Sequence, residues 1–368
     1  MTRNIKELSL EELAGWLSLR GEPPYRAKQI FQWLYRKGVA SFAAMSDLSK
    51  NLRAALESSF TISRPRVARL ARATDGTRKF LFELADGSRI ESVLIPAELG
   101  ERLTLCISSQ VGCGMGCAFC ATATLGLKRG LDAHEIVDQV LEARRMLADA
   151  AQSGEPQSTI TNIVFMGMGE PLHNYHEVVR AVGVLTADWG VGFSPRRITV
   201  STVGLVPQMT RLLGDTRVNL AVSLSGTTDE VRSRLMPINR KYRLTTLLDA
   251  CRGLPLPRRK RITFEYVMLS GRNDSLEDAH RLATLLRGIP SKVNLIPFNP
   301  FPGSGFASTE LPAIEAFRAA LLRQGVHTTI RESRGRDIQA ACGQLAGDVS
   351  AGGDVPYLRN FAPKAAPG

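Results

Sequence analysis

The sequence lacks any apolar run of the roughly 18 residues that a membrane-spanning helix needs. Its first stretch, "MTRNIKELSLEELAGWL", carries acidic residues and lacks the apolar core of a signal peptide. No low-complexity tract or repeated segment is present before the Gly- and Pro-rich end. We therefore expect a cytoplasmic protein without a membrane partner. The 44% hydrophobic and 22% charged residues are typical of a folded chain with a sizeable core.

Cysteine is scarce, with six residues in a chain of 368, which argues against a disulfide framework and favours metal binding or catalysis. Cys251, in "TTLLDACRG", has helical spacing from Leu247 and Leu248, so we interpret it as a small core residue. The other five cysteines need a chemical explanation.

Acidic residues are outnumbered, 35 to 47, which gives a formal net charge of +12. The positive charge is concentrated in four short segments, residues 195–197, 240–243, 257–261 and 331–336. This distribution favours a polyanionic partner such as a nucleic acid. Each segment taken alone could equally be a solvated loop end.

Helical spacing dominates residues 5–60, and an alternation with period two follows in residues 65–96, with "TDGT" and "ADGS" as hairpin turns. From about residue 102, segments typical of strands alternate with helical stretches in six β/α units. We expect a helical accessory domain in residues 1–62, a β-hairpin extension in 63–98, a catalytic domain in 99–348 and a flexible tail in 349–368.

The faces of the predicted strands distinguish a doubly wound sheet from a barrel. In "VNLAVSLSG" (218–226), one face carries apolar side chains and the other carries small and polar ones. A sheet covered by helices on both sides needs two apolar faces, so a curved sheet around a ligand cavity is favoured. Eight units close a full barrel. We therefore expect an α/β fold with a partial, TIM-like (βα)6 barrel, a small helical domain and a short β meander.

Three cysteines, Cys113, Cys117 and Cys120, lie in "CGMGCAFC", after the first predicted strand of the array. Structural zinc usually has four protein ligands, and His134 or Cys106 could supply the fourth. Three thiolates also suit a 4Fe-4S cluster, provided that another molecule binds the fourth iron. The spacing alone leaves both metal centres open.

The cysteines are accompanied by three glycines, Gly112, Gly114 and Gly116. A loop that wraps a bulky cluster needs close backbone approach and positive φ, which glycine adopts without strain. We expect all three glycines to shape this loop.

The spacing of the trio resembles that of the radical S-adenosylmethionine (SAM) superfamily. Three further stretches, "MGMGEP", "NLIPFNPFPG" and "RGRDIQAACGQLAGD", are similar to the RlmN family of RNA methyltransferases, and this resemblance extends to about residue 348. It implies one 4Fe-4S cluster that binds SAM and cleaves it to a 5′-deoxyadenosyl radical. It also implies methylation of carbon 2 of an adenosine in the peptidyl transferase centre of 23S rRNA and of the adenosine 3′ to the anticodon in tRNA.

Carbon 2 of adenine is electron-poor and carries no acidic proton, so a radical route is needed. The resemblance implies that Cys342 takes a methyl group from one SAM and that a second SAM activates it, with two SAM used per turnover. Cys106 then resolves a transient protein–RNA crosslink, forming a disulfide with Cys342, and Glu91 accepts the proton of carbon 2. A flavodoxin-type electron donor and a thiol reductant are implied as partners of a monomer.

The strand patterns bear on two of these residues. Cys106 alternates in phase with Thr104 and Ser108, so we expect it to face the cavity, although a buried inert cysteine would show the same pattern. Glu91 lies in phase with Val93 and Ile95, so we expect an apolar surrounding that raises its pKa; an exposed acid at a strand start is the alternative.

For SAM, the resemblance implies a pocket at the ends of the predicted strands. Most relatives have histidine where this chain has Ser225, although serine can still donate a hydrogen bond. The implied SAM-binding residues are Gly169, Glu170, Ser201, Ser223, Leu224, Ser225 and Asn299.

Two other functions stay open from the sequence. A related enzyme class that methylates carbon 8 of the same ribosomal adenosine shares the cluster and both catalytic cysteines, and the N-terminal helices favour carbon 2 over it. A non-catalytic RNA-binding protein with a structural zinc is the alternative from another class. In either RNA methyltransferase, we expect the N-terminal helices and the basic segments to bind RNA.

Overall fold

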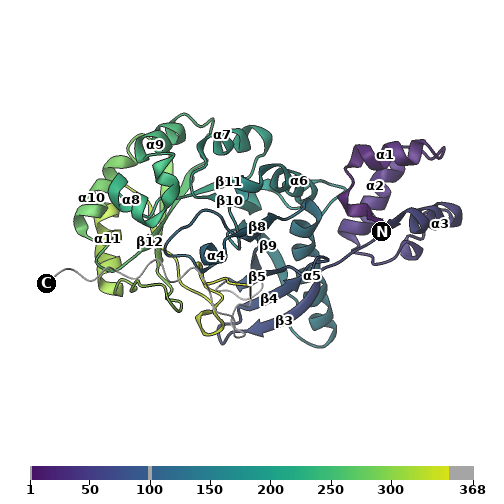
Figure 1. Ribbon diagram of the computed structural model, residues 1–368, viewed down its shortest axis with the longest axis horizontal. Coiled ribbons are helices and arrows are strands. Elements are labelled where there is room, and N and C mark those ends of the chain that lie inside the picture. The colour runs from purple at the N-terminus through teal and green to yellow at the C-terminus, as the bar shows by residue number, and fades with distance from the viewer. Residues whose placement is uncertain (1, 98–101, 348–368) are drawn as a thin grey trace.

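The computed structural model describes residues 2–97 and 102–347 (Figure 1). The expected tail, residues 349–368, lies outside these residues. In Figure 1, a group of N-terminal helices stands at one end of the molecule, and a curved sheet with helices on its outer side forms the rest. No helix among the described residues has the length and apolar character that crossing a bilayer requires.

The N-terminal segment folds into three helices, as the spacing predicts. Ser9 caps the first helix, since its side chain accepts a hydrogen bond from the backbone N–H of Glu12 while the Glu12 carboxylate accepts from the Ser9 N–H. Ile30, Leu34 and Tyr35 are buried together in the core. The helices are α1 (Leu10–Ser18), α2 (Tyr25–Phe31), continued by a π-helical segment (Gln32–Arg36), and α3 (Lys50–Ser59). The short strands β1 (Arg3–Asn4) and β2 (Phe60–Thr61) pair in parallel.

A ten-stranded sheet organises the remainder, in the order β14-β13-β12-β11-β10-β9-β6-β5-β4-β3. The antiparallel meander that precedes the barrel consists of β3 (Arg66–Arg72), β4 (Arg78–Glu83) and β5 (Arg89–Pro96), and β5 pairs antiparallel with β6. The parallel strands are β6 (Arg102–Cys106), β9 (Thr159–Phe165), β10 (Ile198–Thr202), β11 (Asn219–Ser223), β12 (Ile262–Met268), β13 (Ser291–Pro297) and β14 (Thr328–Ile330). The predicted partial barrel is therefore confirmed, since β14 and β3 are the edges of a sheet that does not close over the described residues.

Helices cover the outer face of the barrel. They are α5 (Ala133–Gln152), α6 (Tyr175–Thr186), α7 (Val206–Asp215), α8 (Asp229–Leu235), α9 (Leu244–Arg252), α10 (Leu276–Leu285) and α11 (Leu311–Arg323). All six strands expected from the sequence are present. The sequence pattern missed β14 and the hairpin of β7 (Gln110–Gly112) and β8 (Leu127–Gly130), because three or four residues are too few to show a period.

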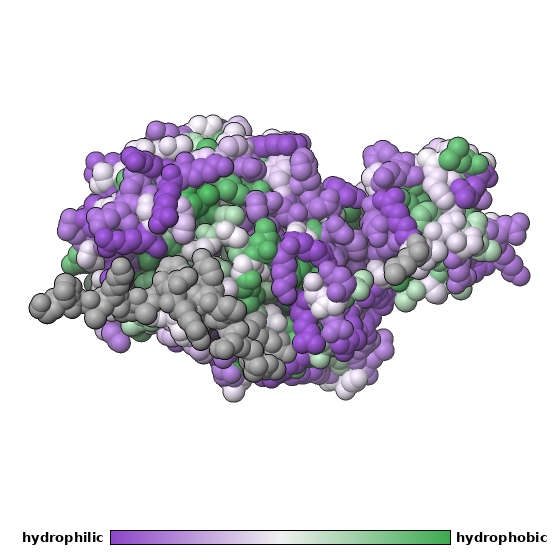
Figure 2. Space-filling view, viewed as in Figure 1, coloured by the Kyte–Doolittle hydropathy of each residue, from purple (hydrophilic) through white to green (hydrophobic). Residues whose placement is uncertain are grey.

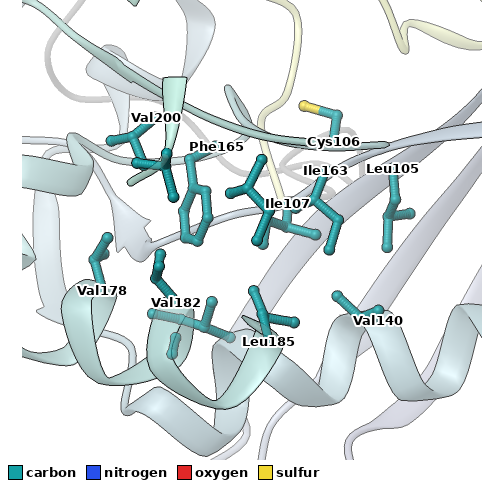
Figure 3. Close-up of a cluster of buried hydrophobic side chains, with 14 of the residues drawn as sticks. Leu105, Cys106, Ile107, Val140, Ile163, Phe165, Val178, Val182, Leu185 and Val200 are labelled. Atoms are coloured by element: carbon teal, nitrogen blue, oxygen red, sulfur yellow. The ribbon is translucent and has the colours of Figure 1, made fainter. Parts of the chain in front are cut away.

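The two faces of β6 are chemically different. Figure 3 shows Leu105 and Ile107 pointing into the apolar layer between the sheet and helices α5 and α6, whereas Cys106 points to the opposite side. The expected orientation of Cys106 toward the barrel interior is confirmed. In the space-filling view, apolar side chains line the opening of the barrel and hydrophilic residues border it (Figure 2).

A buried ion pair joins the N-terminal segment to the barrel. The ammonium of Lys6 lies 2.6 Å from both carboxylate oxygens of Asp138 on α5, and the two residues are 4% and 2% exposed. Next to this pair, the rings of Phe31 and Trp189 approach to 5.3 Å between centroids, which adds an apolar contact across the same junction. Since burying a single unpaired charge costs free energy, the pair favours one position of the N-terminal helices relative to the barrel.

Removing one partner of this pair should destabilise the protein strongly. We expect Asp138→Leu to lower the free energy of unfolding in urea by about 3–5 kcal/mol, because Lys6 is left buried without a counter-charge. The double variant Lys6→Met/Asp138→Leu should recover most of this loss. Asp149→Ala is the matched control, since its pair with Arg145 on the same helix is exposed and should contribute less than about 1 kcal/mol. Equal effects for Asp138→Leu and Asp149→Ala would contradict the role of the buried pair.

Candidate active site

The cysteine trio lies in a loop at the carboxyl end of β6, between β7 and β8. The N–H of Cys113 donates to the carbonyl of Gly126 at 2.9 Å, which closes the base of the loop. Farther along, the N–H of Ala118 donates to the carbonyl of Leu235 at the end of α8, also at 2.9 Å. The loop is thus fixed at two points, and its three thiols line one cavity of about 150 Å³.

Two of the three glycines in this loop have the expected conformation. Gly112 has φ +77° and Gly116 has φ +69°. A Cβ at Gly112 would lie 1.9 Å from the carbonyl oxygen of Gly126, so the backbone approach at this position admits only glycine. The expectation is wrong for Gly114, which does not have positive φ and where a Cβ would make ordinary contact with Leu127 at 3.5 Å.

The three thiols are close enough to influence one another. Burial raises the pKa of Cys113 to about 12 and that of Cys117 well above its usual value, and the neighbouring thiols add to both shifts. Such thiols ionise when a metal binds them. Among the described residues, no group of three or more His, Cys, Asp or Glu side chains could hold one metal ion. In a 4Fe-4S cluster each thiolate binds a different iron, so the trio fits a cluster better than a single zinc.

Most of the residues implied in SAM binding surround the same cavity. The cavity is lined, beside the cysteines, by Gly169, Glu170, Ser201, Ser223 and Asn299. These residues follow or end β9, β10, β11 and β13, whose carboxyl ends meet at one edge of the sheet.

Two implied residues lie elsewhere. Leu224 and Ser225 are fully buried and do not line the cavity. Ser225, at φ +46°, accepts a hydrogen bond from the N–H of Val267 through its hydroxyl and one from Asn273 through its carbonyl. Neither side chain reaches the cavity in this structure, and the implied contact of these two residues with SAM stays a prediction.

Glu170 is held rigidly in the cavity wall. Its carboxylate accepts the N–H of Leu172 at 3.0 Å and that of Val203 at 2.8 Å, while its own N–H donates to Gln110 at 2.8 Å. Burial raises the pKa of Glu170 to about 7. Gln110 was not recognised in the sequence. Its position explains why residue 169 is a glycine, because a Cβ at residue 169 would lie 2.5 Å from the side chain of Gln110.

A second, smaller cavity of about 50 Å³ brings Cys106 and Cys342 together. Val93 and Ile95 of β5 also line it. Burial raises the pKa of Cys106 to about 12, and Cys342 raises it further. All six cysteines are free thiols, so the disulfide expected between Cys106 and Cys342 is not formed.

Cys342 lines both cavities. Two contacts hold its segment against the cysteine loop and β13: the N–H of Ala121 donates to the carbonyl of Gly343 at 2.7 Å, and the side-chain amide of Asn299 donates to the carbonyl of Cys342 at 3.3 Å. One thiol is therefore reachable from the cluster side and from the side of Cys106.

Glu91 has a different surrounding from the one expected. Its carboxylate lies 2.9 Å from the ammonium of Lys79 and accepts the N–H groups of Ala346 and Gly347 at 2.8 and 3.1 Å. The side chain is buried, but the expected apolar surrounding is wrong. It lines a third cavity, of about 330 Å³, which Gln344 also lines.

Arg331 was missed as a single residue, although its segment stood out as a basic cluster. It lines both thiol cavities, and its guanidinium lies 3.8 Å from the carboxylate of Glu265 and 3.4 Å from the sulfur of Met166. The neighbouring Cys342 thiol, followed by Glu265 and Cys106, raises the pKa of Arg331, while burial opposes them. The chain thus places a permanent cation beside both thiols.

Comparisons with known proteins identify the family. Residues 3–62 match the family described as Ribosomal RNA large subunit methyltransferase N-terminal domain, and residues 107–283 match the Radical SAM superfamily. The chain is 54% identical to the dual-specificity RNA methyltransferase RlmN of Geobacter sulfurreducens, over 95% of this chain and 93% of that protein. It is 52% identical to that of Geotalea uraniireducens, over 94% and 96%. The chain belongs to the RlmN family.

The RlmN fold is also seen in a solved structure. The crystal structure of a radical SAM methyltransferase from Sphaerobacter thermophilus superimposes with a TM-score of 0.86 at 45% identity, covering 94% of this chain and all of that one. The resemblance inferred from the motifs is therefore confirmed over the N-terminal helices and the barrel together. The exact domain boundaries expected above, like the role of each RlmN site residue, stay predictions.

The geometry of Gly112 leads to a test of the cysteine loop. We expect Gly112→Ala to lose most of the iron that the parent protein binds, about four per chain after anaerobic reconstitution, because the new Cβ would displace the base of the loop. Gly114→Ala is the matched control and should keep its iron, since its Cβ has room. Iron would be measured by colorimetric assay alongside absorbance near 400 nm. Full iron content in Gly112→Ala would show that the loop does not need this close approach.

Proposed function

We propose that the protein is a radical SAM methyltransferase that methylates carbon 2 of one adenosine in the peptidyl transferase centre of 23S rRNA and of the adenosine 3′ to the anticodon in tRNA. The observation that carries this proposal is the position of Cys342, which lines the cavity of the cysteine trio and the cavity of Cys106 at once. A thiol in this position can accept a methyl group on one side and be attacked on the other. The names of the curated relatives support the choice of RNA as substrate.

The cavity of the trio fits the two cofactors that the family implies. Cys113, Cys117 and Cys120 would hold a 4Fe-4S cluster, which when bound supplies the electron for homolytic cleavage of SAM. Glu170 would accept a hydrogen bond from the SAM amino group, because its carboxylate is already fixed by two N–H groups. The remaining contacts would come from Gly169, Ser201, Ser223 and Asn299, which line the same cavity.

We assign three steps to the chain's own side chains. Cys342 loses its proton and takes the methyl group of one SAM; after hydrogen abstraction by the radical from a second SAM, its methylene carbon bonds to carbon 2. Glu91 accepts the proton of carbon 2, with its carboxylate oriented by Lys79 and by the N–H groups of Ala346 and Gly347. One electron leaves the adduct for the oxidised cluster that the trio would hold, which makes the adduct closed-shell. Cys106 as thiolate then attacks the sulfur of Cys342, which breaks the bond from that sulfur to the methylene carbon and leaves a disulfide. The released carbon takes up one proton and becomes the methyl group of the base.

The cycle needs partners beyond the chain. A flavodoxin-type protein would deliver the electron, a thiol reductant would reopen the disulfide, and two SAM would be consumed per turnover. We propose that the protein acts as a monomer, with RNA held by the N-terminal helices and by basic residues near the opening of the barrel. The guanidinium of Arg20 lies 3.8 Å from the centroid of the Trp16 ring on α1, and this cation–π contact holds one positive charge at the surface of the N-terminal helices.

Carbon 8 methylation is the second candidate, because it would use the same cluster and the same pair of thiols. The match of residues 3–62 to the rRNA methyltransferase N-terminal domain favours carbon 2. A structural zinc is disfavoured because no described group of ligands converges on one ion.

The experiment that tests the function supplies the anaerobically reconstituted protein with SAM, a reductant and a 23S rRNA fragment. After digestion, chromatography coupled to mass spectrometry separates 2-methyladenosine from 8-methyladenosine, which have the same mass. We expect 2-methyladenosine and release of 5′-deoxyadenosine. Formation of 8-methyladenosine would replace the proposal by its second candidate, and cluster-loaded protein without either product would refute both.

Cys106 and Arg331 lead to a test of the resolving step. We expect Cys106→Ala to accumulate an RNase-sensitive crosslink to RNA through Cys342, seen as a slowly migrating band. Arg331→Met should accumulate the same band in part, because Arg331 lowers the pKa of Cys106 against the effect of burial, and its loss leaves less thiolate. In both proteins release should rise up to tenfold for each unit of pH below that pKa, and Arg331→Met should be slower than the parent at each pH.

Arg331→Lys is the conservative control, since it keeps the charge and should restore part of the release rate at neutral pH. A Cys106→Ala variant that turns over fully would disprove the assigned role of Cys106. A release rate in Arg331→Met equal to that of the parent at every pH would limit Arg331 to packing.

A further inference from the structure

Two of the basic segments lie far from the thiols. Residues 195–197 precede β10 and residues 257–261 precede β12, and Arg217 precedes β11, which lies between these strands in the sheet. All three places are at the amino ends of parallel strands, whereas the cysteine loop and the SAM cavity are at the carboxyl ends. Together they surround an open groove of about 890 Å³ at the end of the barrel opposite the active site.

The basic loops around this groove are held in place. The ammonium of Lys260 donates to the carbonyls of Arg217 and Val218 at 2.8 and 2.6 Å, which ties the 257–261 loop to the start of β11. The side-chain amide of Asn219 donates to the carbonyl of Arg196 at 2.8 Å, which ties the 195–197 loop to the same strand. These hydrogen bonds therefore fix the loops relative to one another, so that they form one groove and not a set of independent loop ends.

No carboxylate within residues 2–97 and 102–347 forms an ion pair with the arginines of this groove. Four exposed arginines line it, Arg196, Arg217, Arg258 and Arg259, and no aspartate or glutamate is among the lining residues. Burial and the nearby charge of Arg196 lower the pKa of Lys260, which shows that these cations lie close enough to repel one another. Arg259 is also held at φ +71°, a backbone conformation that few non-glycine residues adopt. A bound polyanion would offset this repulsion.

The chemistry of the lining indicates which polyanion fits. The four free cations are arginines, whose planar guanidinium groups bind phosphate oxygens in bidentate geometry. Ser194, Thr216 and Asn219 add neutral hydrogen-bonding groups of the kind that contact phosphate and sugar. No aromatic side chain lines the groove, so it lacks the aromatic platforms on which unpaired bases usually stack.

We propose that this groove binds the phosphate backbone of RNA at a place remote from the methylated base. The inference rests on the proposed RNA substrate and adds a second contact to it. Strands of five to seven residues separate the two ends of the barrel by about 20 Å. A substrate that reaches both ends is therefore a folded RNA larger than the target stem-loop, and the groove gives preference for such RNA without reading its sequence.

The test compares two RNAs and two double variants. The RNAs are a 23S rRNA fragment that contains the target loop with its flanking helices, and the isolated target stem-loop. Arg217→Gln/Arg258→Gln removes two charges from the groove. Arg287→Gln/Arg323→Gln is the matched control. Both arginines are exposed, Arg287 just after α10 and Arg323 as the last residue of α11, at the same end of the barrel, and neither lines the groove. Binding is measured by filter retention or fluorescence anisotropy at several salt concentrations.

We expect the groove variant to bind the long fragment roughly tenfold more weakly near 0.1 M salt, and the slope of log K against log salt to fall by about one for each lost phosphate contact. The control variant should keep the affinity and slope of the parent. For the isolated stem-loop, the dissociation constant of the groove variant divided by that of the control variant should be close to one. Thermal unfolding of each variant checks that the fold is intact.

Three outcomes would overturn the proposal: parent-like binding of the long fragment by the groove variant, an equal loss in the control variant, or an equal loss with the isolated stem-loop. Under the first outcome, an acidic protein would be the partner of this surface. Under the second outcome, the loss of affinity would come from the lower net charge of the variant and not from the groove. Because binding is measured without turnover, failure of the methyltransferase assay would not alter these results, and failure of the groove would not alter that assay.

Discussion

The site depends on one constraint, which is that a single thiol must be reachable from two cavities. Cys342 lies in a segment without regular secondary structure, and it has its position because Asn299 and Ala121 hold the carbonyls of residues 342 and 343. A shift of this segment by the width of one side chain would remove the sulfur from one of the two cavities. The position of the Cys342 segment therefore depends on both the cysteine loop and the residues that follow β13.

The parallel sheet explains how residues from distant parts of the chain meet at this thiol. Because parallel strands end at the same edge, the last residues of β10 bring Ser201 to the cavity, and the segments after β6, β9 and β13 bring the cysteines, Glu170 and Asn299 to it. The same topology places the turns that precede β10, β11 and β12 together at the other end. The barrel thus separates chemistry from a strongly basic groove by the length of its strands, and the two ends can change independently of each other.

Much of this could be predicted because the signals are local. Alternation in "RLTLCISS" is enough to aim Cys106 away from the helices, and glycine next to cysteine is enough to suggest the sharp turn at Gly112. The surrounding of Glu91 could not be predicted in this way, since Lys79 comes from another strand and the N–H groups of residues 346 and 347 come from about 255 residues farther along the chain. The hydrogen bonds of Ser225 could not be predicted for a similar reason: their donors, Val267 and Asn273, belong to the neighbouring strand and its loop.

A chain of polar contacts connects the two cavities through Arg331. The hydroxyl of Ser201 donates to one oxygen of Glu265 at 2.9 Å, and the other oxygen faces the guanidinium of Arg331 at 3.8 Å. Glu265 is buried, so its charge needs a cation, and Arg331 needs an anion in return. When Cys106 or Cys342 ionises, it competes with Glu265 for the same guanidinium. Ser201 lines the larger cavity and Cys106 lines the smaller one, so Glu265 and Arg331 form a continuous polar connection between the walls of the two cavities.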